Sequence, residues 1–178
     1  MTAALPHRAG PRPRTDRGLP HQQLDQQPTD ETIRARLAAR VFTLAGVVEA
    51  PSGISVPGAR ALVLEDAPTG PPGAFLIDRE FAHLHPPPDL SLHLTLPQRR
   101  AEEAIRAGWA EPHPLVTDGR LPPTVVMVYA PRDEAELAVV AGLVRESCDF
   151  ARGQTRSAGA ERSETTTGRA ERRGPIRE

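Results

Sequence analysis

The chain has 178 residues, a formal net charge of −1 and a single cysteine. This length allows one domain with a hydrophobic core but not two comfortable ones. The near-neutral charge does not favour a dedicated nucleic-acid binder, and one cysteine excludes a disulfide within the chain. Cys148 lies in an apolar helical pattern, which predicts an unreactive buried thiol.

The hydrophobic residues are concentrated in the middle of the chain. They make up only 38% of the sequence, and aromatic residues only 3%. Residues 1–28 and 153–178 are rich in small, polar and charged side chains, so we predict that both segments are disordered. The folded domain is therefore expected over residues 29–152. Both tails are arginine-rich, yet in the second one acidic residues nearly balance the arginines, which is typical of a solvating tail.

No apolar stretch is long enough to span a membrane, since about 18 such residues would be needed. The N-terminus also lacks the apolar run of a secretory signal, and we expect a cytoplasmic protein. The chain contains no lysine and no asparagine but abundant alanine, arginine, glycine and proline. This bias is typical of a high-GC genome, which we interpret as a bacterial source.

The first predicted element is an amphipathic helix in the segment TDETIRARLAARVFTLAG. Thr29 or Asp30 can accept backbone hydrogen bonds at its start, and Gly46 can end it. Its apolar residues recur at the spacing of one helical face, at Ile33, Leu37, Val41 and Leu44.

Short β-rich runs separated by glycine and proline follow this helix and predict a strand meander. We place strands near residues 47–50, 59–64, 73–77 and 80–85. The clearest strand is 90–96, where leucine alternates with Ser, His and Thr. Strict alternation of this kind predicts one buried face and one open face.

Two more helices and one more strand complete the pattern. Pro97 is suited to the first position of a short helix that Gly108 ends. A proline-rich connection then leads to an apolar inner strand over residues 124–130. In the last helix, Asp133 and Glu136 have the spacing of a capping box.

The order of these elements predicts an α+β fold. We expect a small antiparallel sheet, with the N-terminal helix, the short middle helix and the long C-terminal helix packed on one of its faces.

Histidines are the candidate chemical groups of the predicted sheet. His83 and His85 are two residues apart in one strand, so both point to the same side. His93, in the neighbouring strand, can lie close to His83 on that open face. Flanking prolines stiffen the backbone around His113. His83, His85 and His113 could thus form a metal site, and the alternative is hydrogen-bonded histidines on a half-exposed sheet face.

Asp78, Glu80 and Glu111 could serve as acids or bases beside these histidines, or could be merely solvated carboxylates at strand ends. The chain lacks a G-x-S-x-G elbow, a P-loop and a G-x-G-x-x-G motif. Their absence removes the commonest hydrolase and nucleotide-binding fingerprints.

Four segments together resemble the luciferase-domain family of small bacterial and fungal proteins. They are EFAHLH, DLSLHLTLP, AIRAGWAEPHPL and the final PRDEAELAVVAGLVRESCDFARG. The resemblance covers about residues 30–152. The polar residues that match its recurring pattern are His83, His85, Glu111 and His113, whereas His93 is incidental to that pattern. The layout is also similar to the small α+β domains typified by YjbR and MmcQ.

The sequence leaves two functions open. The histidine face could bind a small molecule or a metal, with oxygen-dependent or acid/base chemistry, and the candidate catalytic residues are then His83, His85, Glu111 and His113. Alternatively, the sheet face and tails could form a non-catalytic module that binds protein or nucleic acid. A concave arrangement of imidazoles would favour the first function, and a flat one the second. The sequence predicts no particular cofactor or oligomeric state.

Overall fold

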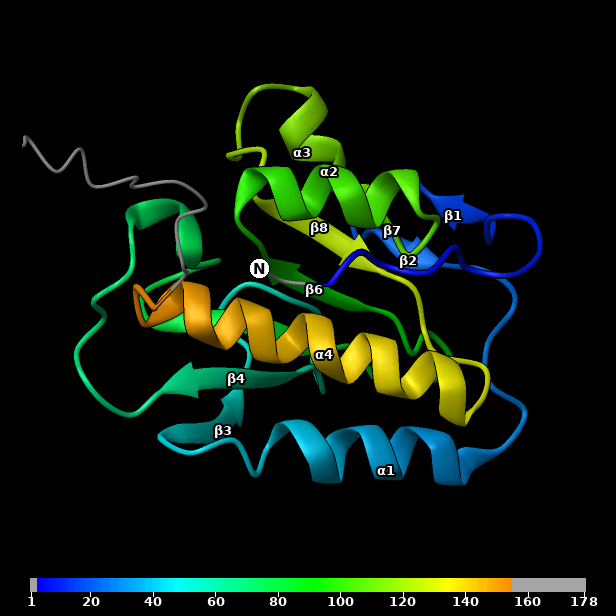
Figure 1. Ribbon diagram of the computed structural model, residues 1–178, viewed down its shortest axis with the longest axis horizontal. Coiled ribbons are helices and arrows are strands. Elements are labelled where there is room, and N and C mark those ends of the chain that lie inside the picture. Colours follow the sequence, from blue (N-terminus) through cyan, green and yellow to red (C-terminus); the bar gives the residue numbers. More distant parts are fainter. Residues whose placement is uncertain (1–2, 155–178) are drawn as a thin grey trace, which may run out of the picture.

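A six-stranded sheet is the centre of the computed structural model, which describes residues 3–154 (Figure 1). Its strand order is β3-β4-β5-β6-β8-β7, and every neighbouring pair is antiparallel. The predicted α+β fold is therefore confirmed. The strands are β3 (Val47–Pro51), β4 (Arg60–Leu64), β5 (Glu80–Leu84), β6 (Leu92–Thr95), β7 (Ala110–Pro112) and β8 (Val125–Val128).

Three helices lie on one side of this sheet, as the sequence predicts. In Figure 1 the long helix α4 (Glu134–Ala151) crosses in front of the strands, and α1 (Glu31–Val41) runs beside it. Helix α2 (Gln98–Arg106) lies on the other side of α4 and packs against β7. The hydrophobic core fills the layer between these helices and the sheet.

Alternation along the strands decides which side chains enter that core. Ala82 of β5 pairs with Leu94 of β6, and Leu84 pairs with Leu92. All four belong to the core cluster on the helical side. Because successive side chains of a strand point to opposite faces, the residues between them point to the other face of the sheet. That second face carries the histidines.

Acidic side chains cap the two long helices. Asp30 Oδ1 accepts from the Thr32 N–H at 2.8 Å, which starts α1. Asp133 Oδ1 accepts from the Glu136 N–H at 2.9 Å, which starts α4. The predicted capping box is therefore half formed, since the Glu136 side chain accepts instead from the Arg132 N–H at 2.9 Å.

Two segments differ from the predicted secondary structure. The strand expected over residues 73–77 is wrong, because a 3-10 turn over Pro72–Ala74 occupies its first half. The proline-rich connection after α2 contains strand β7 and the short helix α3 (Pro114–Thr117). β7 completes the sheet at its edge, and α3 follows it directly.

The largest difference concerns residues 1–28, which we expected to be disordered. Residues 3–28 pack against the domain, and they include the small hairpin β1 (Thr15–Asp16) and β2 (Gln22–Gln23). Polar bonds hold the segment in place: the Ala130 N–H donates to Gln23 Oε1 at 2.8 Å, and Trp109 Nε1 donates to the Pro6 carbonyl at 2.6 Å. Composition alone missed this because hydrogen bonds hold much of the segment, with Leu5 packed against the core.

The C-terminal segment expected to be disordered, 153–178, lies outside the described residues apart from its first two positions. Within residues 3–154, none of the helices combines the length and the apolar character that a membrane crossing requires.

Candidate functional site

Five of the six histidines gather on the sheet face opposite the helices. Neighbouring ring centroids lie 4.7–5.3 Å apart, so the imidazoles are in contact. Four of the rings are almost completely buried. We call this group the histidine cluster, and its members are His21, His83, His85, His93 and His113.

The sheet register brings the cluster together. His83 of β5 and His93 of β6 are direct partners across the two strands. His85 follows β5 on the same side as His83. His113 ends the β7 edge, where its N–H donates to the Val125 carbonyl at 3.5 Å. His21, from the N-terminal segment, stacks on His93 from above the sheet.

A buried carboxylate orients the ring of His83. Glu80 Oε1 lies 2.7 Å from His83 Nδ1. The same carboxylate accepts from the Ser52 hydroxyl at 2.7 Å and from the Gly53 N–H at 2.9 Å. An ionised carboxylate can only accept hydrogen bonds, so the His83 proton is on Nδ1 and the lone pair is on Nε2.

His85 is oriented in the same way. Asp89 Oδ2 lies 2.6 Å from His85 Nδ1, and Asp89 also accepts from the Ser91 N–H at 2.9 Å and from its hydroxyl at 3.1 Å. The lone pair of the neutral His85 ring is therefore on Nε2.

A third carboxylate orients His21. Glu111 Oε1 lies 2.7 Å from His21 Nε2, and Glu111 Oε2 accepts from the Tyr129 hydroxyl at 2.9 Å. This contact puts the proton of the neutral His21 ring on Nε2 and its lone pair on Nδ1. The hydroxyl bond of Tyr129 is the one expected for a tyrosine at the rim of a buried strand.

His93 is the centre of the cluster. Its Nδ1 lies 3.2 Å from His83 Nε2 and 3.1 Å from His85 Nε2. Its Nε2 lies 3.2 Å from His21 Nδ1. Each nitrogen of His93 therefore faces imidazole lone pairs of its neighbours.

Hydrogen bonds keep the three carboxylates ionised. Burial by itself would raise the pKa of Glu80, Asp89 and Glu111. The hydrogen bonds from the partner histidine and from neighbouring hydroxyl and N–H groups outweigh burial, so each carboxyl pKa is lowered.

Burial favours the neutral form of three imidazoles, His83, His93 and His113. Removal from water lowers the pKa of His83, although Glu80 opposes the shift. Burial and then the charges of the neighbouring rings lower the pKa of His93 well below its usual value. Burial, followed by repulsion from His21, His83 and His85, lowers the pKa of His113 to about 4.

Burial and then Glu111 raise the pKa of Tyr129 to about 12.

His113 differs from the other rings in its hydrogen bonding. Its Nδ1 accepts from the Leu115 N–H at 3.1 Å and so caps α3. The proton of the neutral ring is consequently on Nε2. His113 can therefore donate a hydrogen bond from Nε2, but it has no free lone pair while the cap is in place.

A cavity of about 400 Å³ opens onto the histidine cluster. All five imidazoles line it, and the remaining walls are mostly apolar. Leu19 and Ile54 stand at its mouth with 65% and 52% of their surface exposed. The other lining residues are Pro20, Ser55, Val56, Leu76, Leu115, Leu121 and Val125.

The cavity changes the interpretation of the predicted site residues. The structure brings His83, His85 and His113 together and places Glu111 beside them, bonded to His21. The open sheet face that we expected is covered by the N-terminal segment. His93, interpreted as incidental, is instead the ring that contacts all the others. His21 was missed, because it lies in a segment without any pattern of secondary structure.

The three acidic candidates differ in whether they contact the histidine cluster. Glu80 and Glu111 are both hydrogen-bonded to cluster imidazoles. Asp78 makes no such bond; it occupies a turn before β5 with a φ of 48°. The Asp89 carboxylate, which was not considered, orients His85.

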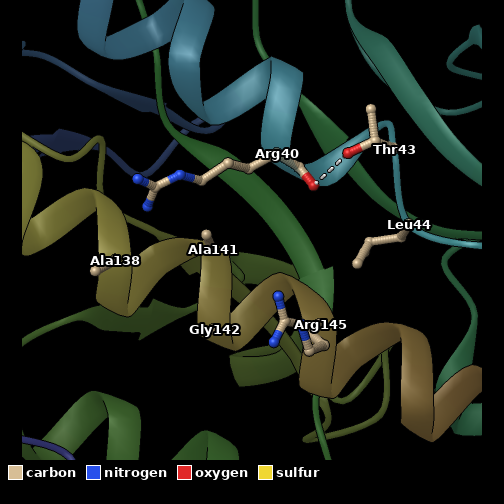
Figure 2. A pocket seen from close by; sticks show the side chains of 7 residues that line it. All are labelled: Arg40, Thr43, Leu44, Ala138, Ala141, Gly142 and Arg145. Carbon is tan, nitrogen blue, oxygen red and sulfur yellow. Dashed lines mark hydrogen bonds between the residues drawn. The ribbon is translucent and has the colours of Figure 1, made fainter.

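A second hollow lies on the helical side of the sheet, between the end of α1 and α4 (Figure 2). The α4 side of this hollow is formed by the small residues Ala138, Ala141 and Gly142. Arg40 and Arg145 reach along it, and Arg40 is paired with Glu134 on α4. This hollow has no contact with the histidine cluster.

Comparison with known proteins agrees with the earlier resemblance. The Luciferase domain model matches residues 78–147, which include four of the five cluster histidines. A protein named Luciferase from Armillaria ostoyae is 32% identical over 161 residues, and the one from Armillaria gallica is equally similar; each alignment covers 82% of this chain. The Neonothopanus nambi Luciferase is 40% identical over 74 residues, or 40% of this chain and 28% of its own.

The chain spans only about 60% of the length of the two Armillaria relatives. These relatives are fungal, so they contradict the bacterial source that the composition suggested. No solved structure matches the chain. The domain match and the similarity over most of the chain establish that this protein belongs to the luciferase-domain family.

Proposed function

We propose that this chain is an enzyme that binds a small, largely apolar organic molecule above the histidine cluster and oxidises it. In this proposal the molecule loses a proton from an acidic O–H or C–H group to the cluster. The substrate keeps the electron pair of that bond, and the resulting anion uses it to form a C–O bond with dioxygen from solution, which gives a peroxide that keeps both oxygen atoms.

The observation that carries the proposal is the contrast between the two sides of one cavity. Its walls are mostly apolar, and its floor is a set of imidazoles. Small-molecule sites have this composition, with a few convergent polar groups inside an apolar cavity of roughly 300–1,000 Å³. The imidazoles converge on the cavity instead of spreading over an open sheet, which favours a ligand site over a flat docking module.

Hydrogen bonds in the cluster give its members different roles. His113, with its proton on Nε2, can donate to a substrate oxygen and stabilise negative charge that develops there. His93 connects through His21 to Glu111, and through His83 to Glu80. A proton that enters at His93 can therefore be shared with either carboxylate.

The relatives support oxidation as the reaction class. They are named luciferases, and a luciferase is by definition an enzyme that oxidises a small molecule with emission of light. The part of their length that this chain matches includes the histidine segment.

Oxygen uptake and light emission would test the proposal. The purified chain would be given the luciferin of the fungal relatives, together with a panel of phenols and enols of similar size. We expect oxygen consumption that saturates with at least one of these compounds. His113→Ser keeps a residue that can cap α3 but removes the ring, so kcat/KM should fall by about 100-fold.

The matched control is His7→Ser, because His7 is exposed and lies outside the cluster. This variant should be as active as the unmodified chain. Absence of binding and of oxygen uptake with every compound would contradict the proposal, and so would equal losses of activity in the two variants.

A further inference from the structure

We infer that His83 Nε2, His85 Nε2 and His93 Nδ1 form a binding site for a divalent transition-metal ion. This set differs from the three histidines that the sequence predicts, because His93 takes the place of His113. One ligand nitrogen from each of these residues lies within 4.8 Å of those of the other two, and all three residues are buried. The site concerns binding alone and describes the cluster when it holds a metal, whereas the proton transfer proposed above uses the metal-free cluster.

The spacing of the nitrogens fits a metal ion. A tetrahedral ion with metal–nitrogen bonds of 2.0–2.1 Å separates its ligand nitrogens by about 3.3 Å. The distances from His93 Nδ1 to His83 Nε2 and to His85 Nε2 are 3.2 and 3.1 Å. Imidazole nitrogens are ligands that Zn²⁺, Cu²⁺, Fe²⁺ and Ni²⁺ accept.

The hydrogen bonds around the rings leave His93 with fewer protons than its contacts require. Glu80 and Asp89 place the lone pairs of His83 and His85 on Nε2, and Glu111 places that of His21 on Nδ1. His93 thus faces lone pairs at both of its nitrogens, yet a neutral ring has a single N–H.

That single N–H cannot satisfy the three neighbours. If it is on Nε2, two lone pairs face the lone pair of Nδ1. If it is on Nδ1, it is shared between His83 and His85, while the Nε2 lone pair faces His21 Nδ1 at 3.2 Å. Facing lone pairs repel at such a distance, and in a buried site water does not screen them.

A metal ion at the three nitrogens removes every one of these conflicts. Binding through Nδ1 leaves the His93 proton on Nε2, from which it donates to His21 Nδ1. His21 in turn donates from Nε2 to Glu111. His83 and His85 keep their protons on Nδ1, bonded to Glu80 and Asp89.

Each ligand then has the partner that metal-bound histidines usually have. In such sites the second ring nitrogen donates to a carboxylate or another acceptor, which fixes the ring and raises its basicity. Two ligands reach a carboxylate directly, and His93 reaches Glu111 through His21. The three ligands also line the cavity, from which a water or ligand can take the fourth position.

A second group of three histidines, His21, His93 and His113, is also compact. It is a poorer site, because the only lone pair of His113 accepts from the Leu115 N–H. Binding there would break the cap of α3. The same reasoning excludes His113 from the metal site.

Cobalt(II) is a suitable probe, because its d–d absorption reports nitrogen coordination. The full chain would be stripped with a chelator, titrated with Co²⁺ and examined for absorption and bound metal, then titrated with Zn²⁺ in competition. We expect one equivalent of Co²⁺ per chain, displaced by Zn²⁺. His83→Gln and His85→Gln should lose the absorption, whereas His7→Gln and His113→Ser should retain it.

A variant that keeps all three ligands, and the unmodified chain itself, control for loss of folding. Asp89→Asn keeps the three ligands and should weaken Co²⁺ binding by about 10–100-fold. In the unmodified chain, Co²⁺ should broaden or shift the amide NMR signal of Met127, the strand partner of His93, but not those of α1. No bound Co²⁺, or binding that persists in both His83→Gln and His85→Gln, would overturn the inference.

These results also separate the metal site from the proposed reaction. Metal binding without oxygen uptake by any compound would retain the site and refute the oxidation. Oxygen uptake by a chain that binds no metal would support the oxidation and refute the metal site.

Discussion

Acidification should destabilise this protein before its carboxylates begin to titrate. The half-buried His113 has a folded-state pKa of about 4, below its ordinary value of 6.5. Between these two values the unfolded chain binds more protons than the folded one, so the contribution of His113 to stability is complete above pH 6.5 and is lost towards pH 4. The lowered pKa values of His83 and His93 act in the same direction.

The size of the effect follows from the shift at His113. Full linkage with these two pKa values gives a loss of about 2 kcal/mol between pH 7.5 and pH 5. Solvent screens a half-buried ring, so we take about half of this figure, or ~1 kcal/mol, as its contribution. The deeper rings should add to it.

Urea denaturation at pH 5, 6 and 7.5, with a chelator present, measures this loss. His113→Ser should reduce the dependence of unfolding free energy on pH by about 1 kcal/mol, because the titrating ring is gone while a residue able to cap α3 remains. His7→Ser should leave the dependence unchanged. A folded state whose stability is constant or increases on acidification to pH 5 would refute the account of neutral imidazoles.

Three further outcomes are expected. Gln23→Ala removes the acceptor of the buried Ala130 N–H, so the unfolding free energy should fall by about 1–3 kcal/mol. The control Gln22→Ala should change the unfolding free energy little. Equal effects of the two variants in denaturation would contradict the packing of the N-terminal segment. Leu19→Ser, at the exposed mouth of the cavity, should leave the melting temperature unchanged but weaken ligand binding, as measured by calorimetry. An unchanged affinity would place the ligand outside this cavity. Burial raises the pKa of the Cys148 thiol, so alkylation of Cys148, detected by mass spectrometry, should require denaturant. Rapid labelling of the native protein would contradict the burial of this thiol.

Regular patterns made much of the fold predictable from the sequence. The helical spacing from Ile33 to Val41 corresponds to α1, and the leucine alternation corresponds to β6. Such patterns succeed because one face of each element packs in a single core. β7 was not predictable in this way: it is three residues long, it contains a proline, and it is defined by pairing with β8.

The site was predictable only in part, for a physical reason. His83 and His85 share a strand, so their common direction follows from the period of two. The position of His93 depends on the register between β5 and β6, which the sequence allowed but did not decide. His21 reaches the cluster because Gln23, two residues away, bonds the domain backbone at Ala130. Composition carries no signal for a contact of that kind.

Three carboxylates, Glu80, Asp89 and Glu111, fix the proton positions of the imidazoles to which they are bonded. Long-range ¹H–¹⁵N NMR of the metal-free, ¹⁵N-labelled protein at pH 7.5 reports the proton position in each imidazole directly. We expect a proton on Nδ1 of both His83 and His85, bonded to Glu80 and Asp89. A proton on Nε2 with none on Nδ1, in either ring, would contradict this assignment.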